Sequence, residues 1–156
     1  MELTPGDYIG ERLILMAETF QLEIVTPEKM VVKDTAEEMQ IPGKNGYLGI
    51  LPGHAPLISE LAVGEISYRS GSETHYLCVA WGFAEVLPDK VTILAETAER
   101  GEEVDCERAQ KAKERAEKRL TSADPEVDVE RAQNALARAN SRLEAAAREG
   151  RGTVSH

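Results

Sequence analysis

From residue 20 the chain reads Phe20-Gln21-Leu22-Glu23-Ile24, with an apolar side chain at every second position. This period of two is typical of a β-strand that buries one face. Short runs of the same kind recur as far as residue 98, and Gly, Pro and Asn residues separate them. Such spacing predicts an antiparallel β-sandwich of about eight to ten strands over residues 17–99.

The expected strands are short and regularly spaced. They cover residues 20–24, 30–32, 38–41, 47–51, 57–61, 65–68, 74–80, 83–87 and 91–95. Gly64, Gly71, Gly82 and the pair Pro88-Asp89 separate the later runs, and these residue types favour turns.

The period changes after Gly101. Apolar residues then fall three or four positions apart, which is the period of an α-helix with one buried stripe. One stripe comprises Ala109, Ala112, Ala116 and Leu120, and the other Val129, Ala132, Leu136, Ala139, Leu143 and Ala146. Because only a short linker separates them, we predict an antiparallel hairpin of two helices over residues 104–149, followed by a disordered tail at 150–156.

Both helical stripes consist mostly of alanine. Burial of apolar surface contributes about 25 cal/mol per Å², so an alanine methyl stabilises the packing much less than a leucine side chain. Helices of this length are also marginal without tertiary packing. We therefore expect the hairpin to be mobile and able to leave the sandwich.

Composition limits the classes of function. The 156 residues and 17.1 kDa suffice for one ordinary domain, or for a small domain with an appendage. The 18 basic and 28 acidic residues give a net charge of -10, which argues against nucleic-acid binding. No apolar run approaches the roughly 18 residues of a membrane helix. Cys78 and Cys106 lack metal-binding spacing, and we interpret both as free thiols.

The sequence contains no motif of an autonomous enzyme. GxxxxGK[ST], GxSxG and HExxH are all absent from it. His54 with Glu60 or Glu85 forms no recognisable catalytic constellation. We predict that the chain is not an enzyme by itself, and that it requires no cofactor and holds no metal.

The stretch Gly46-Tyr47-Leu48-Gly49-Ile50-Leu51-Pro52-Gly53-His54-Ala55-Pro56-Leu57 is the most unusual one. Its three glycines and two prolines fix a tight loop, with His54 near the tip. His54 is either a turn residue bonded to nearby backbone or a contact with another subunit. By their chemistry alone, the preceding Lys44 and Asn45 are a polar hairpin turn.

The string V-D-x-E-R-A-Q occurs twice, at residues 104–110 and 127–133. In each copy the aspartate is expected to cap a helix, because its carboxylate accepts hydrogen bonds from free backbone N–H groups. The glutamate then lies in the first turn, where it favours the helix dipole. Each copy therefore predicts the start of a helix.

The loop at 46–57, together with Gly82-Phe83-Ala84-Glu85-Val86 and the run at 91–99, resembles the epsilon subunit of bacterial F-type ATP synthase. The resemblance runs from residue 16 to residue 149, and a sandwich with this loop followed by an Ala/Arg/Glu-rich hairpin is specific in combination. Residues 1–16 are then either a disordered extension or the product of a start codon assigned too far upstream. We favour the second.

The resemblance implies a rotor subunit without catalytic residues. Such a subunit sits at the foot of the central stalk, binds subunit gamma and the c-ring, and couples proton flow to ATP synthesis. Its C-terminal hairpin extends toward the alpha/beta head and inhibits ATP hydrolysis. The implied location is the cytoplasmic face of the bacterial inner membrane, where the complex holds it as a peripheral protein. No homo-oligomer and no nucleic-acid partner are implied.

The resemblance also assigns residues to three contact surfaces. The c-ring contact comprises Lys44, Asn45 and Tyr47. The gamma interface of the stalk includes His54. The contact with the catalytic beta subunit, made in the extended state, comprises Arg115, Lys118 and Arg119.

Some members of this family bind ATP on the folded hairpin as a regulatory ligand. The corresponding positions here are Glu99, Val104, Asp105, Arg108, Ala109, Arg138 and Arg142, and the sequence departs from the family motif at Val104, where a larger aliphatic residue is usual. Arg138 and Arg142 share one helix face, so both guanidiniums are able to grip a polyphosphate, while Asp105 accepts from adenine or ribose. The second copy of the repeat, at 127–133, leaves an alternative open: the motif is only a helix start.

A second class of function fits the same elements. A free-standing adaptor that senses nucleotides would use the same sandwich and hairpin, and it would be a stable monomer that ignores gamma. A synthase subunit would instead co-purify with the complex.

Overall fold

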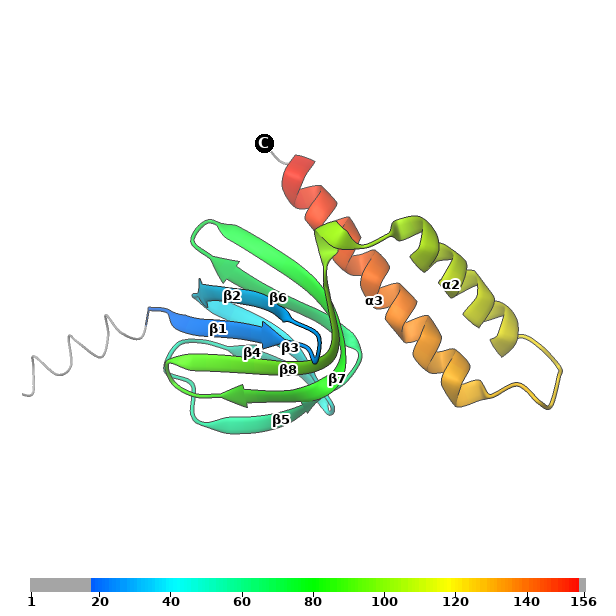
Figure 1. The fold of residues 1–156 in the computed structure, drawn as a ribbon, viewed down its shortest axis with the longest axis horizontal. Helices are drawn as coiled ribbons and strands as arrows, with labels where there is room; N and C mark the ends of the chain where they lie inside the picture. Colours follow the sequence, from blue (N-terminus) through cyan, green and yellow to red (C-terminus); the bar gives the residue numbers. More distant parts are fainter. Residues whose placement is uncertain (1–17, 155–156) are drawn as a thin grey trace, which may run out of the picture.

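The sandwich and the helical hairpin lie side by side (Figure 1). The computed structural model describes the backbone of residues 18–154 and the side chains of residues 18–149. The expectation for residues 1–16, and that for the end of the tail at 155–156, lie outside this described part.

The described residues form eight β-strands in the order β2-β1-β8-β7-β5-β3-β4, and β6 pairs with both β3 and β7. The strands are β1 Phe20–Val25, β2 Met30–Ala36, β3 Glu38–Gly43, β4 Gly46–Ile50, β5 Leu57–Leu61, β6 Gly64–Ser70, β7 Glu73–Val86 and β8 Lys90–Arg100. Each expected run overlaps one of these strands. The sheet curls so that its apolar face encloses one core. The predicted sandwich followed by two helices is confirmed.

The longest strand, β7, turns a corner at Trp81 and Gly82. Its first half pairs with β6 and its second half with β5. Trp81 has φ 53° and Gly82 φ 120°, both in the region that favours glycine. The expected boundary between strands 74–80 and 83–87 was wrong, because the pairing with β8 continues through the bend. The glycine bends one strand and does not end it.

One strand pair departs from the antiparallel pattern. β1 and β8 run parallel, with Ile24 opposite Ile93, whereas the other described pairs are antiparallel. The first and last strands of the sandwich are therefore neighbours in the sheet (Figure 1).

The core lies between the two layers. Leu22, Ile24 and Ile93 are completely buried, as the alternation in β1 and β8 predicts. Burying one such side chain contributes about 1.5–3 kcal/mol. The other large side chains in the core are those of Phe20, Ile41, Ile50, Ile66, Tyr68 and Leu77.

The chain continues from β8 into a short 3₁₀ helix, η1 Gly101–Glu103, and then into α2 Cys106–Leu120 and α3 Val129–Val154. The Asp105 carboxylate accepts from the Arg108 N–H at 3.1 Å, and the Asp128 carboxylate accepts from the Arg131 N–H at 3.0 Å. Both predicted helix starts are confirmed. The helix α3 continues to Val154, where we expected a tail without structure from residue 150.

The helix α3 packs between the sandwich and α2 (Figure 1). Its buried face is made of small residues, including Ala132, Ala139 and Ala145. A Cβ on Gly101 would lie only 2.5 Å from the carbonyl oxygen of Ala145, so the two backbones approach closely at that point. The contact is close but buries little apolar surface.

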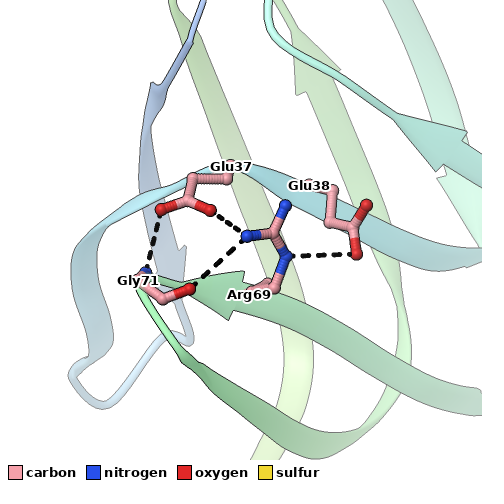
Figure 2. A network of polar contacts seen from close by, with 4 residues as sticks. All are labelled: Glu37, Glu38, Arg69 and Gly71. Atoms are coloured by element: carbon pink, nitrogen blue, oxygen red, sulfur yellow. Dashed lines mark hydrogen bonds and ion pairs between the residues drawn. The ribbon is translucent and has the colours of Figure 1, made fainter.

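A polar network around Arg69 links the β2–β3 connection to the β6–β7 turn, and Figure 2 shows its four residues. The guanidinium contacts the carboxylates of Glu37 and Glu38, and the Gly71 N–H donates to Glu37 at 3.0 Å. Glu37 lies between β2 and β3, and Gly71 lies in the turn after β6. The network therefore holds the corner of β3 against the end of β6.

Candidate functional site

A cavity of about 250 Å³ lies between the sandwich and α3. It gathers three of the residues predicted to bind ATP: Glu99 from β8, and Arg138 and Arg142 from one face of α3. The other residues that line it are Glu28, Lys29, Val63, Cys78, Val79, Ala80, Thr97, Ala98, Glu103 and Ser141. The cavity therefore lies where the hairpin meets the sandwich.

Both arginines contact the sandwich. The Nε of Arg142 donates to the Glu99 carboxylate at 3.1 Å. The guanidinium of Arg138 lies over the Trp81 indole, 5.4 Å from the ring centre, in a cation–π contact. Lys29, from the turn between β1 and β2, adds a third cation to the lining. The lining also holds the carboxylates of Glu28, Glu99 and Glu103, so an anion at this site has to displace Glu99 from Arg142.

Cys78 faces the same cavity as an inert thiol. Burial, followed by the charge of Glu99, raises the pKa of Cys78 to about 11. A thiol with such a pKa stays protonated at neutral pH and is a poor nucleophile. Cys78 and the exposed Cys106 are both free, as predicted.

The other four predicted ATP residues, Val104, Asp105, Arg108 and Ala109, lie at the start of α2 and do not line the cavity. The Asp105 carboxylate is already engaged as the helix cap. Ala109 is buried. The described structure therefore brings three of the seven residues together. The other four form the start of a helix and lie outside the cavity.

Lys29 and Trp81 are two of the residues at the site that were not predicted from the sequence. Lys29 and Trp81 are far from the hairpin in sequence, and only the pairing of β1, β8 and β7 brings them near α3. The one available signal was the single tryptophan of the chain, placed directly before a glycine.

The predicted c-ring residues lie at the β3–β4 turn. The Nζ of Lys44 lies 2.9 Å from the Glu60 carboxylate, and the hydrogen bond to Glu60 and its charge raise the pKa of Lys44. Tyr47 is largely exposed, but its hydroxyl accepts a hydrogen bond from the Glu65 N–H at 3.1 Å. Lys44, Asn45 and Tyr47 together border a cavity of about 420 Å³.

His54 contacts its own loop. Its Nδ1 lies 2.7 Å from the carbonyl oxygen of Ala55, and its backbone N–H donates to the carbonyl of Leu51 at 3.2 Å. This geometry fits a turn residue, and the contact of His54 with gamma stays a prediction.

The residues predicted to meet the beta subunit lie near the end of α2. Arg115, Lys118 and Arg119 line a shallow cavity of about 270 Å³ with Ser122 and Val127. Three cations on one helix end form a basic surface that would attract an acidic segment.

A row of apolar side chains crosses the outer face of the sheet. Phe83 of β7 lies opposite Leu94 of β8, Leu94 lies opposite Val25 of β1, and Val25 lies opposite Met30 of β2. Phe83 is 52% exposed, Leu94 54% and Met30 47%. We call these four residues the apolar row. It was not predicted from the sequence, because the row exists only once four strands are in register.

The two parts of the chain match two models of one family. The model described as ATP synthase, Delta/Epsilon chain, beta-sandwich domain matches residues 19–101, and the model of the long alpha-helix domain matches residues 102–147. The chain belongs to this family.

Individual epsilon chains are closely similar. The ATP synthase epsilon chain of Koribacter versatilis is 74% identical over 110 residues, which are 70% of this chain and 78% of the relative. The epsilon chain of Desulfitobacterium hafniense is 53% identical over 109 residues, 70% of this chain and 83% of the relative.

Two solved structures share the fold. A chain in the cryo-EM structure of the Euglena gracilis mitochondrial ATP synthase, OSCP/F1/c-ring, has a TM-score of 0.71 and 26% identity over 83% of this chain and 81% of that chain. A chain of the Tetrahymena thermophila mitochondrial enzyme has a TM-score of 0.58 and 13% identity over 81% of this chain and 95% of that chain.

Membership in the epsilon family confirms the predicted family. Epsilon chains are non-catalytic subunits of ATP synthase, so this chain is not an enzyme by itself. The match favours a subunit of that complex over a free-standing adaptor. Between residues 18 and 154, no helix has the length and apolar character needed to cross a membrane.

Proposed function

We propose that this chain is a rotor subunit in the central stalk of a proton-driven ATP synthase. It binds gamma and the c-ring, turns with them at the cytoplasmic face of the bacterial inner membrane, and couples proton flow to ATP synthesis. Family membership supports this proposal, as does the likeness to a chain in the Euglena gracilis OSCP/F1/c-ring structure. The observation that carries the gamma contact is the apolar row.

The apolar row has the properties of a binding surface. Its side chains follow one another across β7, β8, β1 and β2, and Ile58 of β5, which is 72% exposed, lies diagonally across from Phe83, opposite Glu85. Contiguous exposed apolar surface on a folded protein marks an interaction site, whereas scattered apolar residues do not. We therefore place gamma on this face.

Introducing charged side chains into the apolar row is expected to weaken the binding of the chain to gamma. In the double variant Phe83→Glu, Leu94→Glu, two carboxylates would have to lose water at the interface, and we expect binding to gamma to weaken about 100-fold or more. Pull-down of gamma by the tagged chain measures the effect. Both side chains are exposed, so the fold should persist.

Val129→Glu is the matched control, because Val129 is also 54% exposed but lies at the start of α3, away from the apolar row. This variant should bind gamma like the wild type. Equal recovery of gamma by the double variant and the control would refute the proposed interface.

The β3–β4 turn is proposed as the c-ring contact, through Lys44, Asn45 and Tyr47. His54, in the loop at the other end of β4, is proposed to belong to the gamma interface. An exposed aromatic side chain and a surface ion pair support this assignment, since both are able to bind polar loops of a partner.

The hairpin is proposed to inhibit ATP hydrolysis after it leaves the sandwich. Its support is the thin interface of α3, which relies on alanines such as Ala139 and Ala145. Once extended, the helices would present Arg115, Lys118 and Arg119 to an acidic segment of the beta subunit in the alpha/beta head. Such pairs are sensitive to salt.

ATP is proposed to hold the hairpin closed. A triphosphate in the cavity would take Arg142 from Glu99 and bind Arg138, and so link α3 to the sandwich. The cavity of about 250 Å³ lies below the roughly 300–1,000 Å³ typical of small-molecule sites, so the phosphates enter it and the nucleoside lies outside. Residues 104–109 are the proposed nucleoside contact.

Calorimetry of the purified chain tests the ATP site. We expect ATP to release heat, ADP to release less, and Arg138→Ala to abolish the signal, because the variant removes one of two cations on the phosphates. Arg131→Ala is the control, since Arg131 lies on the same helix outside the cavity. Absence of heat in the wild type would leave V-D-x-E-R-A as a helix start only.

A further inference from the structure

The dipeptide Gly64-Glu65 lies at the start of β6, where the β3–β4 hairpin and α3 both contact it. From the hairpin side, the Tyr47 hydroxyl accepts a hydrogen bond from the Glu65 N–H at 3.1 Å. From α3, the Ser141 hydroxyl donates to the Gly64 carbonyl at 2.8 Å, and Arg148 pairs with the Glu65 carboxylate at 3.0 Å. We call these five residues the joint.

The joint contains both of the buried polar or charged side chains found among the described residues. Glu65 is 6% exposed and Ser141 is 5% exposed. Buried polar groups are costly unless their hydrogen bonds are satisfied, so their geometry tolerates little displacement. The fully buried apolar residues of α3 are alanines, so polar contacts with the sandwich contribute to its docking, and those of the joint are the ones that lie deepest.

Glu65 is only partly satisfied. One carboxylate oxygen pairs with Arg148, while the other is buried without a partner. Burial raises the pKa of Glu65, the charge of Arg148 lowers it, and the charge of Glu144 raises it. The attraction of the Glu65 carboxylate to Arg148 opposes the cost of burying that carboxylate. A small shift of β6, which carries Glu65, therefore changes the strength of its contact with α3.

The β3–β4 hairpin presses directly on the joint. A Cβ on Gly64 would lie 2.6 Å from Cβ of Pro42 and 2.8 Å from the Tyr47 hydroxyl oxygen. Pro42 and Tyr47 pair across that hairpin, one position from its turn. No space separates the hairpin from β6, and a movement of Tyr47 must therefore move Gly64 or break the hydrogen bond to Glu65.

We propose that the joint couples the β3–β4 hairpin to α3, so that displacement of Tyr47 loosens the docking of the C-terminal helices. The two ends of this coupling are the surface proposed to meet the c-ring and the element proposed to inhibit. The coupling is a property of this chain alone, and only its use by the c-ring rests on the proposed function.

Hydrogen exchange of the full-length chain tests the coupling, with the ratio of exchange in α3 to exchange in β1 and β8 as the readout. Exchange in β1 and β8 reports global stability, so only a change in the docking of α3 raises the ratio. We expect Tyr47→Phe, which removes the acceptor for the Glu65 N–H, to raise the ratio about threefold to tenfold. Ser141→Ala should raise it by a similar factor.

The double variant Tyr47→Phe, Ser141→Ala separates coupling from two independent effects. If both bonds act on one joint, the ratio in the double variant stays close to the larger single effect. A ratio equal to the product of the single effects, or an unchanged ratio in Tyr47→Phe, would overturn the proposal. Ser59→Ala is the control, because its hydroxyl bonds only to the neighbouring Glu60 carbonyl, and its ratio should equal that of the wild type.

This experiment requires no partner subunit. Its failure would leave gamma binding by the apolar row intact, and loss of gamma binding would leave the coupling intact. The two proposals are therefore distinguishable.

Discussion

Replacing Gly82 with alanine is expected to destabilise the β-sandwich severely, although the change adds a single methyl group. Gly82 has φ 120°, which L side chains rarely adopt. Its new Cβ would lie 1.9 Å from the Leu94 carbonyl oxygen and 2.9 Å from Cα of Ala95. These are backbone atoms of β8, so β7 and β8 would have to separate. We expect a loss of about 3–5 kcal/mol in the free energy of unfolding.

Urea denaturation measures this loss, with Gly49→Ala as the control. Gly49 lies in β4, and a Cβ there meets no atom within 4 Å. The control should unfold within about 1 kcal/mol of the wild type. Equal midpoints for the two variants would show that the bend in β7 tolerates a Cβ at position 82, contrary to this prediction.

Replacing Gly101 with alanine is expected to release α3 and leave the sandwich folded. The new Cβ would lie 2.5 Å from the Ala145 carbonyl oxygen and 2.6 Å from Cγ of Glu149. The helix must then move away from η1, because the Ala145 carbonyl is backbone and its helix is rigid. We expect amide exchange in α3 to rise about 10-fold to 100-fold, while exchange in β1 and β8 stays unchanged.

Hydrogen exchange measured by mass spectrometry follows both parts of this variant in one experiment. Unchanged protection of α3 would show that its docking does not depend on the close approach at Gly101. The same variant also tests the proposed inhibition: a synthase that carries it should hydrolyse ATP more slowly than one with the wild-type chain, if the released hairpin is the inhibitory form.

The alternation of apolar residues was sufficient to predict the sandwich, because each strand buries one face and its pattern is local. Leu22, Ile24 and Ile93 all lie in the core as their positions indicate. The pattern failed at Gly82, where a residue that commonly ends strands bends one. Sequence alone does not distinguish these two uses of glycine, since the distinction depends on a partner strand.

At the candidate site, too, features set by neighbouring residues in the sequence were predictable, and features set by contacts between distant segments were not. The helix cap at Asp105 followed from adjacent residues, and Arg138 and Arg142 share a face because helical spacing requires it. The apolar row and the joint were not predictable, because each depends on register between segments far apart in the chain. Phe83 meets Leu94, and Glu65 meets Arg148, only after the sheet is complete.

The parallel pair of β1 and β8 has a consequence for synthesis on the ribosome. β1 can form a hairpin with β2 early, but its other edge stays open until residues 90–94 have been made. Pairing between such distant segments is slow. The sheet therefore closes late, only shortly before α2 and α3 emerge from the ribosome. The helices are then the last part of the chain to fold and dock.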